Sequence, residues 1–232
     1  NVQNAMFAAA LAFSMGKSLE DIRQGLQTFG ATIFQAPGRM NVFDEHPFRV
    51  ILDYGHNAAA IASISQLVSR LEVGGKRICV LAAPGDRRDE DIRAIASEAA
   101  GHYDHYICKA DDNRRGRQSD EVPLMLREQL REAGVDKGQI EIIPDETTAV
   151  NAALEMANEG DLVMIFGDNI ERCWNQVAGH KTEESETPDD LSDTPVQSFV
   201  EEDPEAFTLE PGSELIRDER GVRIARIEEE SD

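Results

Sequence analysis

Short apolar runs alternate with helix-length segments from residue 77 to residue 177, and this alternation constrains the fold more than any other feature of the sequence. The apolar runs have the length and composition of buried strands, at 77–82, 105–109, 139–143 and 162–166. The segments between and after them predict helices at 90–100, 120–132, 147–158 and 170–177. Strands joined by single helices run parallel and carry helices on both faces. The sequence therefore predicts an α/β fold built on a mostly parallel sheet.

The residues before this alternation predict two leading helices and two more strands. An alanine-rich run over 2–15 predicts a buried helix, and Ser18 begins a second helix with Asp21 in the position of a capping box. After a Pro-Gly turn, the pattern predicts strands at 40–43 and 48–52 and a helix at 58–71. The expected domain covers 1–180, with leading helices in 1–36 and the α/β core in 37–178.

The composition changes at Lys181. Residues 181–232 hold 18 acidic and 5 basic residues, a net charge of −13 within a total of −22. Such a segment buries too little apolar surface to offset its conformational entropy, so we predict a largely disordered acidic tail with a short hairpin near 214–227. A field of this sign repels phosphate backbones and anionic lipid, so neither nucleic acid nor a membrane is an expected partner.

The cysteines and histidines show no metal-binding spacing. Three widely separated cysteines form no C-x-x-C pair, and the five histidines lack ligand spacing, so no metal site is expected. This cysteine usage and the absence of a targeting segment favour a cytoplasmic protein. The chain starts without methionine inside a helical pattern, which we interpret as a piece of a longer polypeptide.

The polar residues with chemical potential follow the predicted strands. Ligands of parallel α/β sheets bind beyond the carboxyl ends of the strands. Those ends are here 53–57, 84–89, 109–117, 144–147 and 167–169. Asp53, at the first of these ends, precedes a glycine and the polar pair His56 and Asn57, a group suited to ribose hydroxyls or phosphate. The alternative is that Asn57 merely caps the following helix while His56 packs beside it.

Two further motifs fit a phosphate or a base. Asn1 and Asn4 lie one helical turn apart and offer amides to a ligand, or are ordinary surface residues. Arg39 follows a rigid Pro-Gly turn, where its guanidinium suits a phosphate or carboxylate, or is a plain surface arginine.

Charged loops follow two strands of the same sheet. Residues 84–91 carry Arg87 and Arg88, and residues 111–117 carry three arginines among carboxylates. Mixed charge in one crevice suits a zwitterionic substrate; the alternative is a pair of loops whose charges simply pair with each other. Glu171, at the start of the last helix, lies where it can join the crevice. The sequence lacks a G-x-x-x-x-G-K-[ST] run, a G-x-S-x-G elbow and an H-E-x-x-H motif.

Taken in order, these motifs resemble the C-terminal domain of the Mur ligases. The resemblance rests on Asn-x-x-Asn before an alanine-rich helix, the Gly-Arg turn, Asp-Tyr-Gly-His-Asn, Gly-Asp-Arg and Asp-Asp-Asn-x-Arg. The segments APGRMNVF, ILDYGHN, APGDRRDED, KADDNRRGR and DETTAV are most similar to the Mur-ligase-like part of the cyanophycin synthetase family. The resemblance covers residues 1–178 and implies a Rossmann-like sheet.

The resemblance also implies a function. It implies part of an ATP-dependent acid–amino-acid ligase that forms an acyl phosphate and joins arginine to the aspartate side chains of a poly-aspartate backbone. The implied cofactors are ATP and Mg²⁺, and the implied partners are arginine, an aspartate-rich primer and further copies of the complete chain in a homo-oligomer. The P-loop and magnesium ligands belong to an upstream domain, so this segment alone is expected to be inactive.

Individual roles follow residue by residue from the family motifs. The resemblance assigns Asn1 and Asn4 to the nucleotide, Arg39 to its phosphates and Asp53 to its ribose, and we add Asn57 to this ATP-binding set. It assigns the incoming amino acid to Arg87, Asp112, Asn113, Arg115 and Glu171. We also count His56 as a candidate catalytic residue. The sequence departs from the family at Ala58, where proline is usual, and at Arg114, which replaces the proline of Asn-Pro-Arg.

Three other functions stay open from the sequence. One is another Mur-type ligase, acting on a peptidoglycan precursor or resembling folylpolyglutamate synthases. A second is a relative that polymerises preformed dipeptides. The third belongs to a different class, a non-catalytic α/β binding module whose charged loops are structural.

Overall fold

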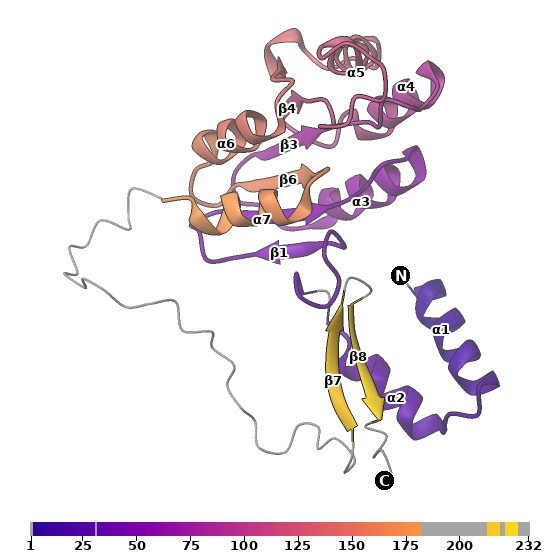
Figure 1. Cartoon of the computed structure of the whole chain (residues 1–232). Coiled ribbons are helices and arrows are strands. Elements are labelled where there is room, and N and C mark those ends of the chain that lie inside the picture. The colour runs from indigo at the N-terminus through magenta and orange to yellow at the C-terminus, as the bar shows by residue number, and fades with distance from the viewer. Residues whose placement is uncertain (1, 31, 182–212, 219–220, 227–232) are drawn as a thin grey trace. The chain divides into compact units, whose positions relative to one another are not determined.

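A six-stranded sheet forms the centre of the computed structural model, which describes residues 2–30, 32–181, 213–218 and 221–226 (Figure 1). The strand order is β1-β2-β6-β3-β4-β5, with β1 antiparallel to β2 and the remaining strands parallel. The strands are β1 (Asn41–Phe43), β2 (Arg49–Asp53), β3 (Arg77–Leu81), β4 (His105–Cys108), β5 (Ile140–Ile142) and β6 (Leu162–Phe166). This sheet confirms the predicted α/β fold, and β6 has the predicted limits.

Helices cover both faces of the sheet, as the single-helix connections require. One face packs against α3 (Ala58–Arg70), α4 (Asp89–Ala99) and α5 (Glu121–Glu132). The other face packs against α6 (Glu146–Met156) and α7 (Ile170–Gly179), and a 3-10 turn at Lys137–Gln139 precedes β5. All five side chains of β6 are buried because this central strand lies between two helical layers.

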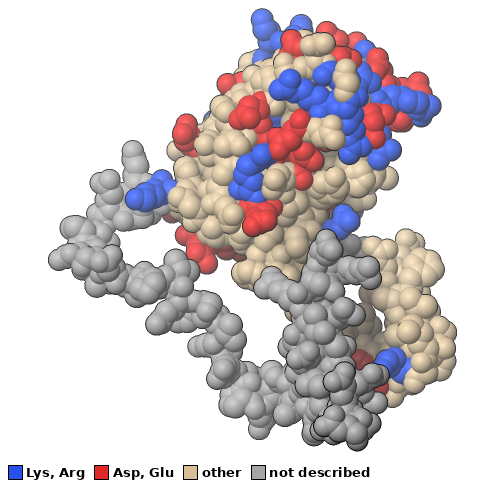
Figure 2. Space-filling view, in the orientation of Figure 1, with Lys and Arg blue, Asp and Glu red and all other residues tan. Residues whose placement is uncertain are grey.

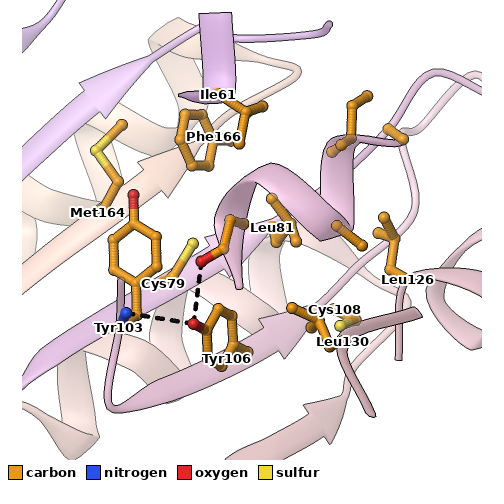
Figure 3. Packing of buried hydrophobic residues seen from close by; sticks show 14 of the residues in the cluster. Ile61, Cys79, Leu81, Tyr103, Tyr106, Cys108, Leu126, Leu130, Met164 and Phe166 are labelled. Atoms are coloured by element: carbon orange, nitrogen blue, oxygen red, sulfur yellow. Dashed lines mark hydrogen bonds between the residues drawn. The ribbon is translucent and has the colours of Figure 1, made fainter. Parts of the chain in front are cut away.

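Apolar side chains fill the layer between the sheet and α3, α4 and α5 (Figure 3). Tyr106 is fully buried there, and its hydroxyl is nevertheless satisfied: it donates to Ala99 O at 3.0 Å and accepts from the backbone amides of Tyr103 and Gly101. A buried polar group that keeps its hydrogen bonds costs little free energy. This core fixes the strands whose carboxyl ends carry the polar loops.

The leading helices α1 (Val2–Ser14) and α2 (Leu19–Thr28) correct one prediction. The capping box at Ser18 and Asp21 is present as predicted. However, no residue of α1 is buried, and Phe7 and Phe13 are 76% and 61% exposed. An alanine-rich composition favours a helix but does not determine how much of it is buried, and α2 contacts α1 without burying any of its residues.

A second unit covers Glu186–Asp232, separate from Asn1–Ser185. Its described residues form an antiparallel hairpin of β7 (Ser213–Asp218) and β8 (Gly221–Arg226), in the stretch for which the sequence suggests one. The predicted disorder of the rest of the tail falls on residues outside those described. No helix in the described ranges is long and apolar enough to cross a membrane.

Candidate functional site

A crevice opens between β3 and β6, where the helices that follow the two strands lie on opposite faces of the sheet. After β3 the chain enters α4 on one face, whereas after the neighbouring β6 it enters α7 on the other. The loops therefore diverge, which is the position at which open α/β sheets bind ligands. The crevice is lined by residues at the carboxyl ends of four strands: Tyr54, Gly55, His56, Ala82, Pro84, Asp111, Phe166, Gly167 and Asp168.

A larger hollow of about 410 Å³ lies at the amino-terminal ends of β2 and β6. His46 and Arg49 line it, but His46 already contacts Val177 O at 2.7 Å and Arg49 pairs with Asp44 at 2.6 Å. No candidate residue from the sequence falls there. The strand-end crevice is therefore the better candidate site, despite its smaller volume.

The turn that carries Arg39 is fixed against the end of β2. Gly38 has a φ of +67°, and a Cβ atom there would lie 2.8 Å from Ile170 Cγ1, so only glycine fits without a shift. Tyr54 N donates to Gly38 O at 2.9 Å, and Met40 N donates to Asp53 Oδ2 at 2.9 Å. Arg39 itself is exposed, beside the predicted ribose ligand.

Asp53 lies almost completely buried at the end of β2, with 6% of its surface exposed. Burial raises the pKa of this carboxyl, while the Met40 amide and the positive charge of Arg39 act in the opposite direction. A buried carboxylate that receives a backbone hydrogen bond has a fixed direction. That geometry suits a hydrogen bond to a hydroxyl group.

His56 and Asn57 have local partners. The Nδ1 atom of His56 lies 3.0 Å from Tyr54 O, and its ring packs against the ring of Tyr54. Asn57 caps α3, since its side-chain oxygen accepts from Ala60 N at 3.0 Å. The structure thus shows the capping role that the sequence offered as an alternative for Asn57, and its nucleotide contact stays a prediction.

The leading asparagines are not brought to the crevice by any described contact. Asn4 is exposed on α1, and it makes no hydrogen bond outside its helix to a described residue. Asn1 lies outside the described residues. Both nucleotide contacts stay predictions.

The two charged loops pair extensively with each other. Arg117 donates to Gly85 O at 2.8 Å, to Arg87 O at 2.8 Å and to the carboxylate of Asp89 at 2.8 Å. Arg115 forms an ion pair with Asp86, which holds the pKa of that carboxyl below its usual range. Figure 2 shows the resulting mixture of basic and acidic side chains over the part of the domain that carries α4 and α5.

Not every charge in these loops is paired. Arg87 is exposed, and within the described ranges its guanidinium has no hydrogen bond or ion pair. Glu171 is likewise exposed in the first turn of α7 without a described partner. Asn113 accepts from Arg115 N at 3.1 Å, which shapes the loop. Arg87 and Glu171 are therefore the predicted amino-acid contacts whose charges are unpaired among the described residues.

Asp112 is held by a residue that sequence reasoning missed. Its carboxylate forms two contacts with Arg172, at 2.7 and 3.0 Å, and Arg172 also contacts Glu146 at 2.5 Å. Glu146 in turn lies 2.7 Å from the Nζ atom of Lys109, and both side chains are fully buried. Burial alone would raise the pKa of Glu146, but Lys109 and two backbone amides lower it to about 2.

Lys109 carried a signal that the sequence analysis did not use. A lysine directly at the end of a buried strand requires a carboxylate partner, because an unpaired buried charge is very costly. Arg172 carried no such signal, since its position in the last helix looks like an ordinary surface site. Asp111 and Asp168 were also not singled out, although both line the crevice.

No group of three or more metal-binding side chains is placed to hold an ion among the residues described. The polar groups of the site and its neighbouring loops are backbone amides, carboxylates and guanidinium groups. It is suited to binding and orienting a polar, charged small molecule.

Comparison with known proteins identifies relatives of this arrangement. The family model "Mur ligase, glutamate ligase domain" matches residues 38–169. Cyanophycin synthetase of Crocosphaera subtropica (strain ATCC 51142 / BH68) is 37% identical over 172 residues, which cover 74% of this chain and 19% of that protein. The UDP-N-acetylmuramoyl-L-alanyl-D-glutamate--2,6-diaminopimelate ligase of Aquifex aeolicus (strain VF5) is 32% identical over 176 residues, or 75% of this chain and 34% of that protein.

A solved structure agrees at the level of the fold. The structure of E. coli FolC in complex with ADP aligns with a TM-score of 0.57 at 24% identity, covering 75% of this chain and 38% of FolC. The chain spans about a fifth of the length of the cyanophycin synthetases that it matches.

Proposed function

Because the chain belongs to the Mur ligase family through its glutamate ligase domain, we propose that it is the amino-acid-delivering domain of a cyanophycin-synthetase-type ligase. In this reaction ATP transfers its terminal phosphoryl group to an aspartate side-chain carboxylate and leaves ADP. The amine of an incoming arginine attacks the acyl phosphate, and the products are an amide, phosphate and a proton. The observation that carries the proposal is that residues of three family motifs, at 54–56, 84 and 111, line one crevice at the switch point of the sheet.

The nucleotide side of the crevice consists of Arg39 and Asp53. Arg39 lies on a turn fixed by Gly38, so that its guanidinium meets a phosphate with little loss of backbone entropy. Asp53 accepts a ribose hydroxyl. Asn1, Asn4 and Asn57 complete the proposed set of nucleotide contacts.

The amino-acid side consists of the two charged loops and the start of α7. Arg87, whose guanidinium is unpaired among the described residues, holds the carboxylate of the incoming amino acid, with Arg115 and Asn113 shaping the other charged loop. Asp112 and Glu171 face its cationic groups. His56 is close to the crevice and is the candidate for accepting the proton of the attacking amine.

The remaining machinery lies elsewhere in the complete enzyme. The sequence has no P-loop, and the described residues offer no cluster for Mg²⁺, so we assign phosphate activation and magnesium binding to another domain. Closure of this domain over that site excludes water from the acyl phosphate, which water would otherwise hydrolyse. The chain by itself is then inactive.

The test is ATP consumption by the complete enzyme with an aspartate-rich primer and a panel of amines. We expect ADP formation that depends on both arginine and primer, and weak or no activity with lysine, glutamate or diaminopimelate. Preference for diaminopimelate or glutamate would indicate another Mur-type ligase, and preference for an aspartyl-arginine dipeptide would indicate a dipeptide-polymerising relative. If none of these substrates supports ATP consumption, the result would indicate a non-catalytic binding module.

A further inference from the structure

Four alternating charges connect the core of the domain to the charged loop at 110–119. They are Lys109, Glu146, Arg172 and Asp112, which we call the charge chain. Lys109 and Glu146 are fully buried, the Arg172 side chain is 33% exposed, and the Asp112 side chain is 47% exposed. The charge chain therefore runs from the interior to the surface of the crevice.

Glu146 is the fixed point of the charge chain. Its two oxygens accept hydrogen bonds from the backbone amides of Asp168 at 2.7 Å and Asn169 at 3.1 Å, both in the loop that follows β6. Lys109 balances its charge from the end of β4. Two backbone hydrogen bonds and the ion pair with Lys109, from two strand ends, leave this side chain very little freedom to move, so whatever Glu146 binds is also fixed.

Arg172 transmits this position to Asp112. Its Nη2 atom donates to Glu146 at 2.5 Å, and its two terminal nitrogens contact the two carboxylate oxygens of Asp112 at 2.7 and 3.0 Å. This bidentate fork fixes both the distance and the plane of the carboxylate. The backbone amide of Asp112 also donates a hydrogen bond to Asp168 Oδ2 at 3.0 Å.

We infer that Glu146 and Arg172 are positioning residues that hold the Asp112 carboxylate in the orientation required to receive the incoming amino acid. The inference rests on the proposed function, which assigns that contact to Asp112. Each carboxylate oxygen keeps a second lone pair after binding Arg172, and the half-exposed side chain leaves it accessible to a cationic group. Arg172 therefore orients Asp112 without blocking it.

The first test measures steady-state kinetics of the complete enzyme with Arg172→Gln. We expect the KM for arginine to rise about tenfold while the KM for ATP changes less than about twofold. Arg172→Lys keeps the charge but lacks the fork, so it restores only part of the loss. The matched control is Arg49→Gln, which removes an arginine paired with Asp44 at the amino-terminal ends of the strands, away from the crevice, and leaves both KM values unchanged. Equal effects on both KM values would overturn the inference.

A double-mutant cycle tests whether Arg172 acts through Asp112. Asp112→Asn raises the KM for arginine, and adding Arg172→Gln to it has little further effect if the two residues form one unit. Fully additive effects would show that Arg172 acts independently of Asp112 and would contradict the inference.

Glu146 requires a paired substitution because Glu146→Gln alone leaves Lys109 buried without its nearest counterion. The variant Lys109→Met/Glu146→Gln removes both charges together. We expect it to raise the KM for arginine in the same direction as Arg172→Gln. An unchanged KM for arginine in the folded variant would exclude Glu146 as a positioning residue.

A crystal structure of the Arg172→Gln variant gives a readout that does not depend on the substrate. We expect the Asp112 side chain to leave its present orientation. If Asp112 keeps that orientation, the inference is wrong whatever the enzyme joins. If Asp112 moves but no amine supports ATP consumption, the proposed function fails while the positioning of Asp112 by Arg172 stands.

Discussion

At the scale of single residues, Arg87 is a predicted amino-acid contact whose guanidinium has no hydrogen bond or ion pair among the described residues. Arg115 and Arg117 are committed to Asp86, Asp89 and backbone carbonyls, whereas Arg87 is not. An unpaired arginine at the start of a helix beside a crevice is the natural ligand for a carboxylate. We therefore assign the contact with the substrate carboxylate to Arg87 rather than to the loops in general.

For Arg87→Ala we expect kcat/KM for arginine to fall by about 10- to 100-fold, since a charged hydrogen bond contributes roughly 1.5–3 kcal/mol. Arg87→Lys also loses activity, because a point charge does not reproduce a bidentate fork. Steady-state kinetics with each substrate varied in turn measures this. A similar loss for ATP would instead indicate a folding or closure defect.

Glu146 makes a separate prediction about acid unfolding. Its pKa in the folded chain is lowered from 4.5 to about 2, so its ionised form adds stability above pH 4.5 that is lost as the pH falls toward 2. The linked free energy is at most about 3 kcal/mol. Urea unfolding at a series of pH values measures it.

The control for that titration is Glu146→Gln. This variant is less stable at neutral pH, and its free energy of unfolding decreases less steeply than that of the wild type between pH 4.5 and 2. An equally steep decrease in both proteins would show that other carboxyl groups dominate the acid response.

From the sequence, the position of a candidate residue was predictable where that residue lies at the end of a predicted strand. His56 lines the crevice because it comes just after β2, and Asp53 is the last residue of that strand. The pairing of Asp112 was not predictable, because its partner Arg172 is 60 positions away and reaches it only through the packing of α7. Long-range ion pairs depend on tertiary structure, and motif spacing does not encode them.

At the scale of elements, the strand limits and the two leading helices were predictable, and the exposure of α1 was not. Continuous apolar runs indicate buried strands, so the predicted limits of β3, β4 and β6 are within one residue of those observed. The exposure of α1 depends on what lies against it, which the sequence of the helix does not state. Element identity is local information, whereas burial is not.

Gly85 joins the two charged loops, and its replacement tests their coupling. A Cβ atom there would lie 2.3 Å from the backbone oxygen of Arg114. A backbone atom cannot move aside as easily as the end of a flexible side chain. We expect Gly85→Ala to destabilise the domain by about 1–3 kcal/mol and to raise the KM for arginine. Thermal unfolding and kinetics measure the two effects.

Gly138→Ala is the matched control for this substitution. Gly138 has no positive φ, and a Cβ atom there meets nothing within 4 Å. The control retains wild-type stability and kinetics. If the two variants behaved equally, the close approach of the loops would contribute neither to stability nor to the KM for arginine.

At the scale of the whole molecule, the two units are predicted to be separable. The first unit contains the sheet and the crevice, and the second contains the acidic tail with its hairpin. Truncation after Lys181 is expected to leave the free energy of unfolding of the domain and the KM values of the complete enzyme unchanged. Loss of the native oligomer, measured by light scattering, would show instead that the tail mediates assembly.

The central claim is that this domain takes part in amide formation through an acyl phosphate, and isotope transfer in the complete enzyme tests it most directly. The aspartate side-chain carboxylates of the primer are labelled with heavy oxygen, and the phosphate released with ADP is analysed by mass spectrometry. The account predicts that labelled phosphate accumulates together with the amide product, and that arginine is required. Release of unlabelled phosphate only, at the rate of amide formation, would contradict it.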